Sequence, residues 1–144
     1  MSFDLGRFVE AQDRVIEQVR RELREGRKRS HWMWFVFPQL SGLGHSAMAQ
    51  RYALASVEEA EAYLKHSILR PRLIECTGLV NKVDGRSISD IFGNPDDLKF
   101  HSCMTLFSSV PNAPPVFEDA LAKYFSGVRD RLTMEGLAII GDAS

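Results

Sequence analysis

The amino-acid sequence predicts an all-α fold, a compact single domain of about eight helices spanning residues 1–144. Three observations lead to this prediction. Residues 5–25 have helical hydrophobic periodicity, capping residues recur before the later segments, and no segment shows the alternation of a half-buried strand. A chain of 144 residues, 44% hydrophobic and 26% charged, has the size and composition of one ordinary globular domain. No repeat, low-complexity segment or change in composition marks a second domain.

The first predicted helix covers residues 5–25. On a helical wheel its apolar side chains fall within one arc of about 120°. They are Leu5, Phe8, Val9, Val15, Ile16, Val19 and Leu23. Asp4 can cap the start, and Gly26 can supply the left-handed exit. This pattern indicates a helix that packs one side on the core and exposes a charged face.

The next segment, residues 31–37, is the aromatic run His-Trp-Met-Trp-Phe-Val-Phe, closed by Pro38. Periodicity cannot distinguish a helix from a buried strand in so short a run. Ser30 as a possible N-cap favours a short helix, and residues 39–45 are expected to form a loop.

The later helices are predicted from their start signals. Ser46, Ser56, Ser67 and Ser87 each precede a segment of helical character, and Ser56 opens a capping box. Asn94 followed by proline and two aspartates marks another start. The predicted helices cover residues 46–54, 56–65, 67–83, 87–92, 94–110, 116–125 and, more weakly, 131–140.

Charge, apolar runs and cysteines exclude several classes of protein. Eighteen basic and nineteen acidic residues give a net charge of −1, which argues against nucleic-acid binding. The longest apolar run, residues 32–37, is far short of the roughly 20 residues that span a bilayer, and no signal-peptide pattern begins the chain. Cys76 and Cys103 lack CxxC or zinc-ligand spacing, which indicates two buried thiols. We expect a cytoplasmic protein without metal or cofactor.

Two motif matches carry little chemistry. Residues 42–47 match the dinucleotide-binding pattern G-x-G-x-x-A, but Pro38 interrupts the chain before it and no second strand with an acidic end follows. A plain turn is the better interpretation. Cys103 lies two residues from His101, a spacing that points the two side chains to different sides of a helix and disfavours a thiol–imidazole pair.

Three polar residues fall where apolar ones are expected. Gln12 lies on the apolar arc of the first helix, Lys99 points with Cys103 and Leu106, and His31 opens the aromatic run. A buried polar group must be hydrogen-bonded, so these residues either form buried networks or line a pocket. Lys99 has a further option, because its long side chain can reach solvent.

The basic segment before the aromatic run leaves the same choice open. Arg24, Arg27, Lys28 and Arg29 lie at a helix C-terminus, where cations are favourable without any ligand. Beside Trp32 and Trp34 they could also hold an anion and stack a ring, although tryptophans are more often part of a core.

Residues 28–39 and 95–107, together with the shorter stretches 8–12 and 62–66, resemble a bacterial family named domain of unknown function eighteen-ten. Some of its members carry a "calpastatin" label that nothing in this sequence supports. The resemblance spans nearly the whole chain and implies a mainly helical single domain. It implies no activity, cofactor or catalytic residue. Gln12, His31 and Lys99 all lie inside the stretches that carry it.

Two functions remain in competition. The first is a binding site for a small anionic or nucleotide-like ligand, with His31 the one plausible acid or base and catalysis left open. Its candidate residues are Gln12, Arg29, His31, Trp34, Gln39 and Lys99. The alternative is a protein–protein interaction module without a ligand site. A concave pocket that joins the candidate residues favours the first, and a sealed core favours the second.

Overall fold

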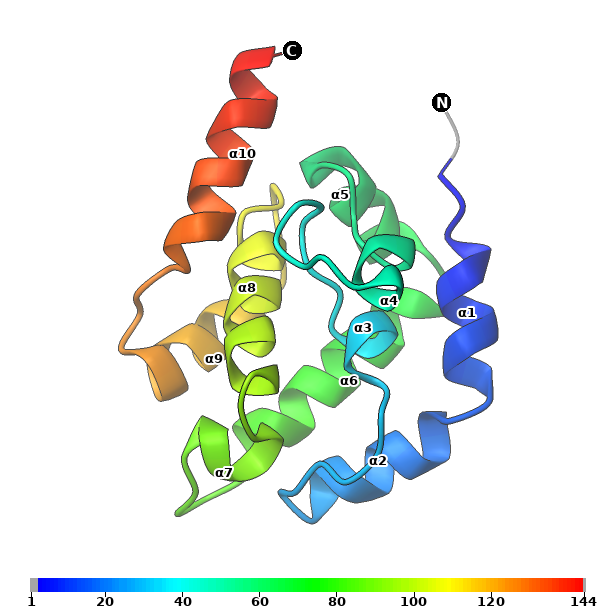
Figure 1. The fold of residues 1–144 in the computed structure, drawn as a ribbon. Coiled ribbons are helices and arrows are strands. Elements are labelled where there is room, and N and C mark those ends of the chain that lie inside the picture. Colours follow the sequence, from blue (N-terminus) through cyan, green and yellow to red (C-terminus); the bar gives the residue numbers. More distant parts are fainter. Residues whose placement is uncertain (1–2, 144) are drawn as a thin grey trace.

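The computed structural model describes residues 3–143, and side-chain surroundings for residues 3–139 (Figure 1). The predicted all-α fold is confirmed: these residues contain ten helices, against the eight or so expected. Over the same range, strand-type pairing is confined to one isolated parallel bridge between Leu40 and Leu54. The helices are α1 (Gly6–Asp13), α2 (Ile16–Arg24), α3 (Met33–Val36), α4 (Ala47–Arg51), α5 (Val57–Lys65), α6 (Leu69–Asn81), α7 (Ile88–Phe92), α8 (Asp96–Ser108), α9 (Val116–Phe125) and α10 (Arg131–Ala143). No helix within residues 3–143 combines the length and apolar character needed to cross a membrane.

Two helices, α6 and α8, organise the packing. Helix α6 contacts α2, α5 and α9, and α8 contacts α5, α7, α9 and α10. In Figure 1, α1 and α10 lie on opposite sides of the molecule, and α10 rises beside α8. The main contacts of α10 are with α8, so its position depends on that helix.

The single helix predicted for residues 5–25 is wrong, because the structure divides it into α1 and α2. Val15, with φ −131° and ψ −4°, breaks the helix. Helix α1 packs against α3 and α2 against α6, two directions that one straight helix cannot satisfy. Val15 and Ile16 are β-branched and resist a break less than better helix formers would.

The predicted serine caps are confirmed at three helices. The side chains of Ser46, Ser56 and Ser87 accept hydrogen bonds from backbone N–H groups three residues on, at 3.1–3.2 Å. The capping box predicted at Ser56 is wrong, because Glu59 Oε1 accepts from the backbone N–H of Ala55. Ser87 instead forms a full capping box with Asp90. These short polar signals fix the starts of α4, α5 and α7, as expected.

At four other helices the predicted cap is wrong. Neither Asp4 at α1 nor Asn94 at α8 makes a capping hydrogen bond. Ser30 does not cap α3; its hydroxyl donates to Glu22 Oε2 at 2.6 Å. Ser67 does not cap α6; His66 Nδ1 instead accepts from the backbone N–H groups of Ile68 and Leu69, at 3.1 and 3.3 Å. At α6 the histidine side chain thus satisfies backbone groups that the serine was expected to bind.

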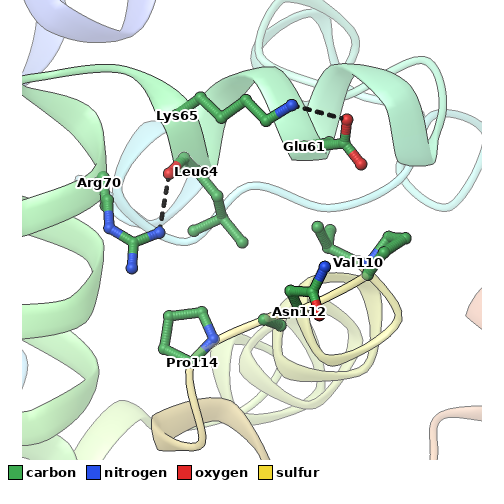
Figure 2. Close-up of a pocket in the computed structure, with 9 residues that line it drawn as sticks. Glu61, Leu64, Lys65, Arg70, Val110, Asn112 and Pro114 are labelled. Carbon is green, nitrogen blue, oxygen red and sulfur yellow. Dashed lines mark hydrogen bonds and ion pairs between the residues drawn. The ribbon is translucent and has the colours of Figure 1, made fainter.

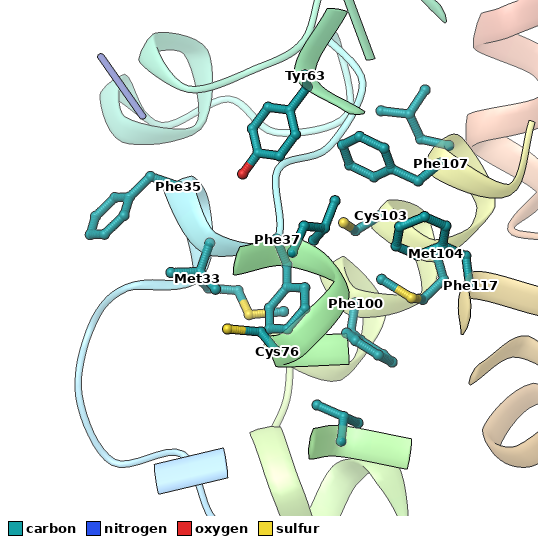
Figure 3. Close-up of a cluster of buried hydrophobic side chains, with 14 of the residues drawn as sticks. Met33, Phe35, Phe37, Tyr63, Cys76, Phe100, Cys103, Met104, Phe107 and Phe117 are labelled. Atoms are coloured by element: carbon teal, nitrogen blue, oxygen red, sulfur yellow. The ribbon is translucent and has the colours of Figure 1, made fainter. Parts of the chain in front are cut away.

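Aromatic rings fill the centre of the core, which Figure 3 shows in close-up. The Phe37 ring lies 5.1 Å from Phe100 and 5.7 Å from Phe92, edge to face in both pairs, and 6.2 Å from Trp32. Edge-to-face contacts stabilise aromatic pairs beyond the area that they bury. The predicted helix 30–37 therefore delivers its rings mainly to the core, with α3 and the residues after it as the anchor.

A buried carboxylate, Glu22 on α2, ties this aromatic segment to the second helix. Its side chain is 1% exposed. It accepts hydrogen bonds from the backbone of Arg29 (2.7 Å) and Ser30 (3.1 Å) and the side chains of Ser30 (2.6 Å), Trp32 (3.0 Å) and Gln18 (2.8 Å). Burial by itself raises the pKa of Glu22, but the hydrogen bonds outweigh it and lower the pKa to about 2.

Both cysteines are free and buried, as predicted. Burial raises the pKa of Cys76 to about 12 and raises that of Cys103 as well. Because the thiolate is the reactive form, we expect a chromogenic disulfide reagent near neutral pH to label neither thiol rapidly in the native protein. The denatured protein should react at once and release two equivalents of the reagent's coloured thiolate per chain. Fast labelling of either cysteine in the native state would contradict this burial.

Candidate functional site

A cavity of about 280 Å³ lies between the loop after α3, the first half of α8 and the start of α10. It is lined by Gln39, Leu43, Gly44, Pro95, Leu98, Lys99, Ser102, Asp130 and Leu132. Leu98, Lys99 and Ser102 come from one side of α8, because positions three and four apart are neighbours on a helix. The cavity therefore combines leucine walls with one cation, one carboxylate, an amide and a hydroxyl.

Backbone contacts hold the loop that forms one wall of this cavity. The carbonyl of Gln39 accepts from the backbone N–H of Leu54 at 2.9 Å, and Ser41 donates to the Leu54 carbonyl at 2.7 Å. At Gly44 the loop passes so close to α4 that an added Cβ would lie 2.6 Å from Ala49 Cβ. Any larger residue at position 44 would push the loop away from α4 and change the cavity.

Lys99 supplies the cation of the cavity. Its ammonium lies 5.4 Å from the centroid of the Trp34 ring and 3.6 Å from Asp96 Oδ1. The other oxygen of Asp96 pairs with Lys28 at 2.9 Å. One carboxylate thus serves two ammonium groups, so Lys99 is only partly neutralised, and its side chain remains 25% exposed.

Asp130 supplies the carboxylate and stands directly before α10. Its Oδ2 accepts from the backbone N–H of Thr133 at 3.0 Å and from the Thr133 hydroxyl at 2.6 Å, as an N-cap residue does. Ser102 donates to the same oxygen at 3.1 Å or, alternatively, to the Leu98 carbonyl. These bonds fix the carboxylate against α8, where it reaches the cavity.

The structure brings three of the six candidate residues together. Gln39 and Lys99 line the cavity, and Trp34 lies against the Lys99 ammonium. Lys99 reaches solvent as its long side chain allows: the side chain is 25% exposed, whereas Cys103 and Leu106, one and two turns further along α8, are fully buried.

The other three residues lie elsewhere. Gln12 is buried, and its Nε2 donates to the Phe35 carbonyl at 2.7 Å and to Tyr63 Oη at 3.0 Å, a network inside the core. Arg29 is 58% exposed and pairs with Glu25 at 2.6 Å. His31 is exposed and does not line this cavity. For Gln12 and Arg29 the geometry therefore favours a structural or solvated role.

Sequence reasoning did not select Ser102 or Asp130. A signal existed for both: Ser102 lies one turn after Lys99, and Asp130 precedes Thr133 by three, a spacing typical of an N-cap. The approach of Asp130 to α8 depends on the path of the chain through α9, which no local pattern encodes.

A second hollow is lined partly by charged side chains, but both of its basic side chains already interact with other groups of the protein. Figure 2 shows it between α5, α6 and the segment after α8. Its volume is about 210 Å³. Lys65 pairs with Glu61 at 3.1 Å, and Arg70 donates to the Leu64 carbonyl at 3.0 Å. These cations already have partners within the protein, which makes the cavity beside Lys99 the stronger candidate site.

Comparison with known proteins places the chain in a family. The crystal structure of the conserved hypothetical protein Rv1873 from Mycobacterium tuberculosis is similar to this chain, with 61% sequence identity and a TM-score of 0.93. The similarity covers 94% of this chain and 97% of that one. A comparison with curated proteins found no match to this chain. A family model described as protein of unknown function (DUF1810) matches residues 2–137, so the resemblance is confirmed and the chain belongs to this family.

Proposed function

We propose that this protein binds a small molecule that carries an acidic group, in the cavity lined by Gln39 and Lys99. We propose that it does so in the cytoplasm. The observation that carries the proposal is the position of Lys99. Its ammonium lines a concave site, lies against an aromatic ring and shares the Asp96 carboxylate with Lys28. Two buried free thiols support a reducing compartment.

The surroundings of Lys99 suit the binding of an anion. A carboxylate or phosphate oxygen can replace Asp96 as the partner of Lys99, because the Asp96 contact is long at 3.6 Å and Asp96 keeps Lys28. Gln39 supplies a further hydrogen-bond donor in the same cavity, its side-chain amide. A charge-assisted hydrogen bond is worth about 1.5–3 kcal/mol, which corresponds to roughly 10- to 100-fold in affinity.

Trp34 provides the readout for a test. We expect titration with isocaproate, a branched carboxylate, or with inorganic phosphate to change its fluorescence, and Lys99→Met to weaken binding of the responding anion at least about tenfold. The matched control is Lys65→Met, whose side chain is 75% exposed on α5 and lies outside the cavity. Trp34→Phe identifies the signal, because Trp32 is buried and bound to Glu22.

Stability measurements keep this test interpretable. Lys99→Met should change the free energy of unfolding by no more than about 0.5–1 kcal/mol, because partly exposed ion pairs contribute little. Equal affinity in wild type and Lys99→Met, with both proteins folded, would refute the proposal.

Exposed apolar side chains support a second candidate function, a protein–protein interaction module. Leu98 and Leu132, both walls of the cavity, are 58% and 57% exposed, and Ile139 further along α10 is 69% exposed. Apolar groups gathered on one surface are typical of interaction sites. If neither anion binds the wild type, an interaction surface becomes the better explanation of these leucines.

A further inference from the structure

The cavity beside Lys99 contains a negative charge as well as a positive one, which bears on what kind of ligand it can accept. Lys99 and Asp130 line the same cavity yet do not pair with each other within 4.0 Å. The nearest acidic partner of Lys99 is Asp96. A ligand that carried only negative charge would meet the Asp130 carboxylate at a cost.

We infer that the ligand is a zwitterion with an aliphatic body, of the class of the apolar α-amino acids, whose carboxylate binds Lys99 and whose ammonium binds Asp130. This inference rests on the proposed function and specifies its ligand class. An ammonium donates three hydrogen bonds, and a carboxylate accepts them from Lys99 and from amide or hydroxyl donors. The cavity presents both kinds of partner, Asp130 for the first and Lys99 and Gln39 for the second.

Asp130 has an oxygen to offer. The hydrogen bonds that position its carboxylate all converge on Oδ2. Among the described residues, none reaches Oδ1. The N-cap bonds hold the side chain in place without a ligand, so binding would not have to order it.

The remaining walls match an aliphatic side chain. Leu43, Leu98 and Leu132 line the cavity, and the last two are more than half exposed, so a bound alkyl group would remove apolar surface from water. The volume of about 280 Å³ lies just below the roughly 300–1,000 Å³ of sites for drug-sized ligands. An adjoining hollow, which shares Leu43 and Leu132 and extends to Ile139, leaves room for longer side chains.

Three compounds of one shape test the inference: L-leucine, isocaproate, which lacks the ammonium, and L-leucinamide, which lacks the carboxylate. We expect calorimetric titration of the folded protein to show leucine binding roughly 10- to 100-fold more tightly than either of the others. Asp130→Asn should weaken the binding of leucine and leucinamide about tenfold, while the affinity for isocaproate stays equal or improves. Lys99→Met should weaken the binding of leucine and isocaproate but not that of leucinamide.

The variants are chosen so that the fold survives. Asparagine is as good an N-cap as aspartate, so Asp130→Asn keeps the start of α10. Asp84→Asn is the matched control, because Asp84 is 97% exposed and lies outside the cavity. Thermal melts of each variant check that the affinities belong to folded protein.

The outcomes separate this inference from the proposed function. If isocaproate binds through Lys99 as tightly as leucine, or if Asp130→Asn leaves leucine affinity unchanged, the inference of a zwitterionic ligand is wrong. The proposed anion site then stands. If leucinamide binds as tightly as leucine, Lys99 does not hold the ligand and both proposals fall. Absence of binding by leucine, isocaproate and phosphate alike also overturns both.

Discussion

Glu22→Gln is expected to destabilise the protein by about 2–3 kcal/mol at neutral pH and to flatten its loss of stability in acid. The carboxylate is 1% exposed and accepts five hydrogen bonds. The amide oxygen of glutamine can keep the three donors that now meet Oε1. The amide nitrogen cannot accept from Ser30 or Gln18, which now donate to Oε2.

The sign of the pH dependence follows from the lowered pKa. In the unfolded chain the carboxyl of Glu22 has its ordinary pKa of 4.5, and in the folded protein hydrogen bonds lower the pKa to about 2. The stabilisation is therefore complete above pH 4.5 and is lost as the pH falls toward 2. A shift of this size corresponds to about 3 kcal/mol.

Urea unfolding at about pH 7, 5 and 3 measures this contribution directly. The difference in free energy of unfolding between wild type and Glu22→Gln should be largest at neutral pH and shrink in acid. Glu58→Gln is the control, because Glu58 is exposed in the first turn of α5 and should cost no more than about 1 kcal/mol. A difference that stays constant with pH would contradict the assigned role of Glu22.

Capping chemistry explains why the sequence predicted the fold class and many helix starts. Ser46, Ser56 and Ser87 act within four residues of chain, so their effect is local and visible in the sequence. The break at Val15 has no local signal, because it arises from the packing of α1 and α2 on different partners. Tertiary contacts override weak propensities at such places.

The buried charge of Glu22 had a detectable signal. Glu22 lies seven residues after Val15, on the same face of an ideal helix, so the periodicity placed a carboxylate on the apolar side. The hydrogen bonds that Glu22 accepts could not be predicted. The donors from Arg29, Ser30 and Trp32 come together only because the chain turns back after α2.

The candidate site shows the same division. Lys99 was selected because a charge on an apolar helix face needs an explanation, and it does line a cavity. Arg29 and His31 lie close to Trp34 in sequence, but the turn before α3 sends them to solvent. Asp130 joins the cavity through a contact between α10 and α8, which depends on the whole fold.

Phe37→Ala is expected to cost about 3–5 kcal/mol of stability, the usual range for removing a fully buried phenylalanine. The side chain is 1% exposed and contacts three other aromatic rings, those of Trp32, Phe92 and Phe100. These rings come from three separate parts of the chain, and the surrounding helices cannot close the space without moving one of them. The loss therefore combines transfer to water with a cavity.

Chemical denaturation measures this loss, with Phe125→Ala as the comparison. Phe125 is only partly buried and stacks on His101 at 4.0 Å near the end of α9, so its truncation should cost less than half as much. If Phe37→Ala does not fold, Phe37→Leu should still lose about 1–1.5 kcal/mol, because a smaller apolar side chain fills part of the space. A loss below about 1 kcal/mol for Phe37→Ala would show that the ring is not at the centre of the core, since only a site that collapses freely tolerates such a truncation.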